Sequence, residues 1–144
     1  GLKENSTYYY SVEKNGVRTP AEVYKTGSFS NVNILYVGDP QVGASKGQPQ
    51  GEGKLSADPG AANTAARNDG FGWDRTLDIA LAENPDLNFV ISAGDQVNKT
   101  GKPKEEEYAA YLSASALKSL PVATTIGNHD SLNKDYSYHF NNPS

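Results

Sequence analysis

Three short apolar runs, each ending in a glycine, mark the chain after residue 32. They are NILYVG at residues 33–38, NFVISAG at 88–94 and VATTIG at 122–127. Continuous apolar runs of this length are typical of strands buried on both faces, as in a parallel sheet. We therefore predict three buried parallel strands.

Helical periodicity lies between these runs. Residues 71–83 place apolar side chains on one face at i, i+4, i+7 and i+8, namely Trp73, Leu77, Ala80 and Leu81. We expect Trp73 to pack in the core against the sheet. A second helix is predicted to open at Pro103, with three glutamates in a solvated first turn, where they suit the helix dipole. These are Glu105, Glu106 and Glu107, and the apolar stripe after them is Tyr108, Tyr111, Leu112 and Leu117. The order β-α-β-α-β predicts an α/β fold with a parallel sheet.

The remaining segments lack this pattern. Residues 1–28 favour β structure, and Asn15-Gly16 between two β-rich runs predicts a hairpin. Residues 42–70 are rich in Gly, Ala, Asn and Pro without periodicity, which predicts a long loop.

Composition narrows the function classes. The chain has 144 residues, 13 basic and 17 acidic side chains and a net charge of −4, without a basic block, so we expect no nucleic-acid-binding surface. No apolar run approaches the roughly 18 residues of a membrane span. Cysteine is absent, which excludes disulfides and thiolate metal sites in this chain. Methionine is also absent, even at position 1, so we expect the chain to be a piece of a longer protein.

Each predicted strand ends in glycine followed by carboxylate or amide side chains. The three ends are Gly38-Asp39-Pro40-Gln41, Gly94-Asp95-Gln96-Val97-Asn98 and Gly127-Asn128-His129-Asp130. Ligands of open α/β sheets bind beyond the carboxyl ends of the strands, and neighbouring strands lie about 5 Å apart. Asp39, Asp95 and Asn128 are therefore expected to converge on one site.

These donors suit a metal centre. Oxygen and imidazole ligands without thiolates favour Zn²⁺, Mn²⁺, Fe or Mg²⁺. Two metals about 3.5–4 Å apart need a bridging carboxylate, and Asp95 is our candidate for that bridge.

The ordered set GD…GD…GNHD resembles the calcineurin-like metallophosphoesterases, which include the purple acid phosphatases. GLKENSTYYYSV at residues 1–12 is similar to the late strands of the fibronectin-III-like domain that precedes the catalytic domain in purple acid phosphatases. YHFNNPS at residues 138–144 also resembles the segment after the third motif in bacterial members. The resemblance implies two domains: residues 1–28 end a fibronectin-III-like β domain, and residues 29–144 form the first part of a catalytic domain. The expected fold is the βαβαβ half of a metallophosphoesterase sandwich, preceded by a β-hairpin.

The resemblance also implies roles for single residues. Asp39 matches a metal ligand, Asp95 the bridging carboxylate and Asn128 the amide ligand of the second metal. Gln41 stands where many members have histidine, and it either ligates weakly through its amide oxygen or supports the ligands from outside. Asn98 stands where purple members have the tyrosine that gives their colour, so no tyrosinate–iron absorption is expected.

The implied activity is hydrolysis of phosphate esters at a centre of two metal ions, Fe, Zn or Mn. His129 matches the histidine that contacts the phosphate and assists the leaving group, and Asp130 would orient its imidazole. Further histidine ligands of the family come from later motifs, whereas this chain has only His129 and His139. We therefore expect about half of a metal site, little activity alone, and a need for the remainder of the catalytic domain.

Two other interpretations stay open. The chain could be a non-catalytic extracellular binding module that keeps the fold, and Gln41 in place of histidine is its best support. A nucleotide-binding α/β domain is weakly supported, because no glycine-rich phosphate loop follows the first strand. Secretion or a cell-surface location is expected only because enzymes with such an accessory domain are commonly exported.

Overall fold

A parallel sheet of three strands forms the centre of the protein. The computed structural model describes residues 1–45, 49–50, 53–54, 61–99, 104–131 and 134–142. The sheet order is β5-β8-β9, and its strands are β5 (Ile34–Val37), β8 (Phe89–Ser92) and β9 (Val122–Thr124). Both pairings are parallel. The predicted α/β fold is confirmed, with the strand before Asp95 in the middle of the sheet.

The register brings the three strand ends to one level. Val37 pairs with Ser92, and Ser92 pairs with Thr124. Each of these residues is the last of its strand, so the three following loops leave the sheet side by side.

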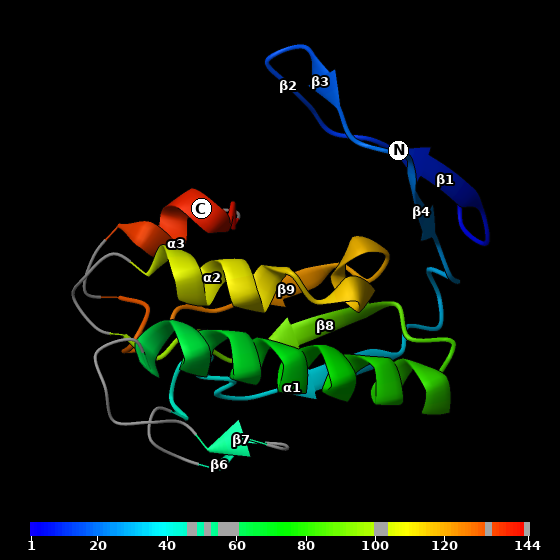
Figure 1. The fold of residues 1–144 in the computed structure, drawn as a ribbon. Coiled ribbons are helices and arrows are strands. Elements are labelled where there is room, and N and C mark those ends of the chain that lie inside the picture. The colour runs from blue at the N-terminus through cyan, green and yellow to red at the C-terminus, as the bar shows by residue number, and fades with distance from the viewer. Residues whose placement is uncertain (46–48, 51–52, 55–60, 100–103, 132–133, 143–144) are drawn as a thin grey trace.

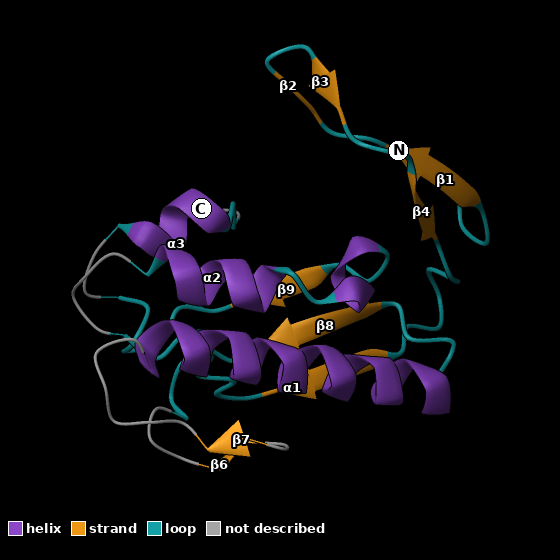
Figure 2. Ribbon diagram, in the orientation of Figure 1, coloured by secondary structure: helices purple, strands orange, loops and turns teal. Residues whose placement is uncertain are grey.

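Two helices lie on the same side of this sheet, as Figures 1 and 2 show. They are α1 (Ala61–Glu83) and α2 (Glu105–Leu112), followed by the short helices η1 (Ser115–Lys118) and α3 (Asp135–His139). The start expected for the first helix was wrong, because α1 begins ten residues earlier, inside the expected loop. Gly70 contributed to that error. It is a helical glycine whose added Cβ would lie 2.9 Å from the Ala110 Cβ, so it permits a close approach of α1 and α2.

The hydrophobic core fills the space between these helices and the sheet. Its buried members are Val42, Trp73, Leu77, Val90, Tyr111, Ala114, Ala116 and Leu120. Trp73 stacks on Tyr111 with ring centroids 5.3 Å apart, and its indole N–H donates to the Tyr111 carbonyl at 3.2 Å. The expectation that Trp73 belongs to the core is confirmed.

Two details of the expected burial were wrong. Tyr36 of β5 is 70% exposed, because among the described residues both long helices cover only the opposite face of the sheet. The stripe expected to reach Leu117 stops early, because α2 ends at Leu112 and Ala114 has an extended backbone. Pro103, the expected start of this helix, lies outside the described residues.

The N-terminal segment forms two strand pairs. Strand β1 (Thr7–Tyr10) pairs with β4 (Glu22–Lys25), and β2 (Glu13–Lys14) pairs with β3 (Val17–Arg18). Between β2 and β3, Asn15 and Gly16 have φ of 52° and 77°, as a type I′ turn requires. The hairpin predicted at these residues is confirmed.

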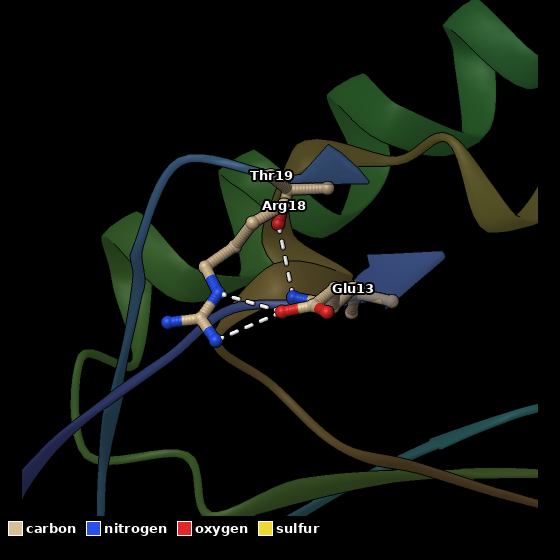
Figure 3. A network of polar contacts seen from close by, with 4 residues as sticks. Glu13, Arg18 and Thr19 are labelled. Atoms are coloured by element: carbon tan, nitrogen blue, oxygen red, sulfur yellow. Dashed lines mark hydrogen bonds and ion pairs between the residues drawn. The ribbon is translucent and has the colours of Figure 1, made fainter. Parts of the chain in front are cut away.

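Polar side chains hold the open end of this hairpin (Figure 3). Arg18 contacts Glu13 at 2.9 Å, and the Thr19 hydroxyl accepts a hydrogen bond from the Val12 N–H at 3.0 Å. Both ions of the pair are well exposed, so it contributes at most about 1 kcal/mol.

The N-terminal strands contact the α/β part through η1. The Tyr10 hydroxyl donates to the Lys118 carbonyl at 2.6 Å, and Lys118 pairs with Glu22 at 2.9 Å. A further small hairpin, β6 (Pro49–Gln50) with β7 (Gly53–Lys54), lies in the segment expected to be a loop. The division into domains at residues 28 and 29 stays a prediction. None of the helices in the described part of the chain has the length and apolar character needed to cross a bilayer.

The buried Tyr111 predicts a specific loss of stability at alkaline pH. Burial raises the pKa of its phenol to about 12, so above pH 10 ionisation favours the unfolded chain. The free energy of unfolding should fall by about 2–3 kcal/mol between pH 10 and pH 12 through this group alone. Urea denaturation at pH 8, 10 and 11 should show this extra loss in the native protein and not in Tyr111→Phe. The same decrease of the free energy of unfolding with pH in both proteins would contradict this prediction.

Candidate functional site

The loop after β5 carries the first candidate residues in a strained conformation. Asp39 and Gln41 have φ of 45° and 38°, and Asp95 after β8 has φ of 49°. The other described non-glycine residues with positive φ are Asn5 and Asn15; asparagine and aspartate enter this region more readily than other residue types, so Gln41 is the least expected of the five. Each such residue costs about 1–3 kcal/mol, and strain of this kind gathers at functional sites. Three of the five strained positions are therefore residues that the sequence pattern selected for chemistry.

Asp95 lies at the meeting point of the three loops. Its carboxylate is largely buried, and Oδ1 accepts a hydrogen bond from the His129 N–H at 2.8 Å. Oδ2 faces the Gln41 side-chain amide, with Nε2 at 3.4 Å, and the Asp95 carbonyl accepts from the Gln41 N–H at 2.8 Å. Asp95 thus contacts both the loop after β5 and the loop after β9.

Glycine makes this crowding possible. A Cβ at Gly127 would lie 2.1 Å from Asp95 Oδ1 and 2.3 Å from the Asp95 nitrogen. A Cβ at Gly94 would lie 3.0 Å from Gly127, and Gly94 has φ of +98°. The glycine before each polar group therefore permits the second and third loops to touch.

His129 is held at three points. Its N–H is bound to Asp95, its carbonyl accepts from the Lys104 ammonium at 2.6 Å, and its ring Nδ1 contacts the Asn98 carbonyl oxygen. Because a carbonyl oxygen only accepts, Nδ1 carries the hydrogen in this contact. The neutral ring is then the Nδ1–H tautomer, with Nε2 as its free base.

Asp130 does not have the geometry expected for a residue that orients the imidazole. Its buried carboxylate accepts from the Gly127 N–H at 3.0 Å, the Gln96 N–H at 3.4 Å and the Tyr108 hydroxyl at 3.2 Å. These bonds hold the backbone of the loop, because unpaired N–H groups in a buried turn need acceptors. Within the described chain, the partner of the His129 ring is the Asn98 carbonyl instead.

A comparison with protein families gave one result. A family model described as calcineurin-like phosphoesterase matches residues 32–144. The chain belongs to the calcineurin-like phosphoesterase family. A search of curated proteins and a search of solved structures each found no match. The family acts on phosphate esters and generally uses divalent metal ions, so the oxygen-rich strand ends of this phosphoesterase can be tested as metal ligands.

The donor set fits hard or borderline cations only in part. Asp39 and Asn128 are exposed, and within the described chain neither side chain makes a hydrogen bond, so their oxygens are available to a ligand. Asp95 adds Oδ2, whose contact with Gln41 is long. The described residues do not bring three His, Asp or Glu side chains together as a metal-holding group. This part of the phosphoesterase thus offers two carboxylates and up to three amides, and the assignment of all five as ligands stays a prediction.

Three residues of this phosphoesterase site were not predicted from the sequence. They lie at the start of α2 and are buried: Lys104, Glu107 and Tyr108. Glu107 is only 3% exposed, so the expected solvated position was wrong for this glutamate, whereas Glu105 and Glu106 are exposed as expected. Burial raises the pKa of its carboxyl, against the lowering effect of hydrogen bonds from the Lys99 and Asn98 N–H groups. Lys104, Glu107, Tyr108 and Tyr111 follow the spacing i, i+3, i+4 and i+7, which places Glu107 on the same inner face of the helix as the two tyrosines.

Substitution of Gly127 tests how closely the loops meet. Gly127→Ala places its Cβ against the Asp95 backbone, which cannot move without breaking the His129 bond, so we expect a loss of at least about 2 kcal/mol. The measurement is urea denaturation.

Gly72→Ala is the matched control. A Cβ at Gly72 meets nothing within 4 Å, and alanine in a helix should stabilise by about 0.5–1 kcal/mol. The same small effect of both substitutions would show that the close approach of Gly127 and Asp95 is not present in solution.

Proposed function

We propose that this chain contributes one half of a two-metal hydrolytic centre for phosphate esters, in the purple acid phosphatase-like branch of the family. The observation that carries the proposal is the position of Asp95. A carboxylate that is 7% exposed, in a strained backbone conformation, lies between the loops of two neighbouring strands. Gly94 and Gly127 allow these loops to approach the carboxylate closely.

The proposed ligands are Asp39, Asp95 and Asn128, with Gln41 and Asn98 as further candidates. Metal ions held by these residues would supply a water molecule of lowered pKa and positive charge beside the phosphoryl oxygens. In this proposal the carboxylate of Asp95 must keep a fixed orientation. The His129 N–H on Oδ1 does this and leaves the Oδ2 side toward Gln41.

His129 is proposed to move a proton at Nε2. The Asn98 carbonyl holds the hydrogen at Nδ1, so the opposite nitrogen is the one that can protonate a leaving oxygen or bind the phosphate. The Lys104 and Asp95 contacts fix the main chain of the same residue. The imidazole ring of His129 therefore has little freedom to rotate, and Nε2 keeps a fixed direction.

Several finer points belong to the same proposal. Residues 1–28 are proposed to end a fibronectin-III-like domain, and the protein is proposed to be secreted or at the cell surface. The sequence resemblance supports both statements. We also propose that this chain alone has little activity, because His129 and His139 are its only histidines and His139 packs against Tyr108 at 4.4 Å.

A binding module without catalysis is the second candidate. Gln41 favours it, because the amide faces Asp95 where many members of the family have histidine. Such a module would bind phosphate or metal weakly and would not turn over.

Replacement of Asp95 tests the hydrolytic function. We expect Asp95→Asn to lower metal-dependent hydrolysis by the complete protein at least a hundredfold, because an amide cannot bridge two cations. The substrates are p-nitrophenyl phosphate as monoester and bis-p-nitrophenyl phosphate as diester, with Zn²⁺, Mn²⁺ or Fe added, and bound metal is measured in parallel.

Asp78→Asn, an exposed change on α1, is the control and should leave turnover unchanged. Near-normal turnover in Asp95→Asn would remove the bridging role. No turnover of either ester with any metal would favour the binding module.

The colour of the metal-loaded protein tests the role of Asn98. We expect the iron-loaded protein to be colourless or pale, because asparagine gives no tyrosinate-to-iron charge transfer. The measurement is the visible absorption spectrum of concentrated protein with its iron content determined. An intense visible band would contradict the absence of a tyrosinate ligand.

A further inference from the structure

The start of α2 contacts all three strand-end loops. Glu107 reaches the loops after β5 and β8, while Lys104 and Tyr108 reach the loop after β9. Figure 1 shows this end of α2 beside the ends of the strands.

Glu107 holds one particular stretch of backbone. Its Oε2 accepts hydrogen bonds from the Asn98 N–H at 3.0 Å and from the Lys99 N–H at 2.8 Å. Its Oε1 lies against Gly43, where an added Cβ would be 2.4 Å away. The carboxylate is therefore enclosed between two loops and has little freedom to turn.

The bond to Lys99 has a consequence for His129. The Lys99 N–H and the Asn98 carbonyl belong to the same peptide unit, which is planar and trans, since the described residues include no cis peptide bond. In a trans peptide the N–H and the C=O point in opposite directions. When Glu107 fixes the N–H, it also aims the C=O, and that oxygen contacts Nδ1 of His129.

The other side of His129 is held from the same turn. Lys104 donates to the His129 carbonyl, and the Tyr108 hydroxyl donates to Asp130, whose carboxylate holds the Gly127 N–H. The ring and the main chain of His129 thus depend on one helical turn, with Glu107 responsible for the ring.

We propose that Glu107 is a positioning residue, which fixes the tautomer and direction of the His129 imidazole through the Asn98–Lys99 peptide. The effect on catalysis rests on the proposed role of His129 in hydrolysis. The effect on the tautomer does not, because it follows from the hydrogen bonds of the chain without metal.

The first test reads the tautomer directly in the metal-free chain. Long-range ¹H–¹⁵N spectra at pH 8 distinguish Nδ1–H from Nε2–H rings, and the chain has only two histidines. We expect Nδ1–H for His129 in the native protein and a mixture of both tautomers in Glu107→Ala. Glu107→Gln keeps an acceptor oxygen and should restore the native spectrum.

Glu106→Ala is the matched control, because Glu106 is the exposed neighbour in the same helical turn. It should leave the tautomer unchanged. A native spectrum in Glu107→Ala, or equal changes in both alanine variants, would overturn the proposal.

A second measurement needs no variant and covers the case in which Glu107→Ala does not fold. The Lys99 amide should exchange with solvent at least a hundredfold more slowly than an exposed amide, because Glu107 binds it. Exchange at the rate of an exposed amide would overturn the proposal.

The third test separates this proposal from the proposed function. In the complete protein, Glu107→Ala should lower kcat for p-nitrophenyl phosphate at least tenfold with little change in KM, and Glu107→Gln should recover most of it. If Asp95→Asn abolishes turnover but Glu107→Ala keeps native kcat, the positioning role fails and the hydrolytic function stands. If the complete protein does not turn over but the tautomer changes as expected, the hydrolytic function fails and the positioning role stands.

Discussion

The register of the parallel sheet is the constraint on which the candidate site depends. Val37, Ser92 and Thr124 end their strands side by side, and neighbouring strands are about 5 Å apart. Three loops therefore leave the sheet within about 10 Å of one another. They fit only because glycines stand where they touch and because Asp39, Gln41 and Asp95 accept left-handed backbone conformations. The register of the sheet therefore accounts for the crowding of the loops, their positive φ angles and the convergence of polar side chains.

Loops that leave a sheet together have backbone N–H groups without ladder partners, and buried carboxylates supply the acceptors. Asp69 accepts from the Gly43 and Ser45 N–H groups, Glu107 from those of Asn98 and Lys99, and Asp130 from those of Gly127 and Gln96. Acidic residues near the site thus fall into two groups. Asp39 is exposed and accepts no such bond from the residues that the structure describes, while Asp69, Glu107 and Asp130 hold the loops. Asp95 belongs to both groups, because Oδ1 holds His129 and Oδ2 faces Gln41.

The sequence was sufficient for features that local chemistry determines. The three strands and the Asn15-Gly16 turn follow from apolar runs and from a residue pair that favours positive φ. It was insufficient where a long-range contact decides. In the sequence Gly70 is typical of a loop, and only its close approach to Ala110 explains a glycine inside α1. Likewise Glu107 is typical of a solvated helix turn, and only its bonds to the Asn98 and Lys99 N–H groups explain its burial. Asp130 follows His129 directly, yet its carboxylate turns to Tyr108, because the peptide geometry of the tight turn sends neighbouring side chains in different directions. Tyr36 was expected to be buried because it belongs to a continuous apolar run. That expectation failed because an apolar run does not reveal how many faces of a strand are covered.

Gln41 stands where the sequence resemblance implies a histidine in many family members, and its geometry bears on the proposed metal site. Its N–H donates to the Asp95 carbonyl, which keeps the main chain of this residue beside Asp95. At a histidine in this position, protons would compete with a metal for the imidazole nitrogen near neutral pH, whereas an amide does not titrate and offers a weaker, neutral oxygen. If the proposed ligand set holds, glutamine would contribute less to the metal affinity than histidine, and more of that affinity would come from Asp39, Asp95 and Asn128. The precise placement of Asp95 by Gly94, Gly127 and the His129 N–H then matters more than it would in a site with a full set of imidazole ligands.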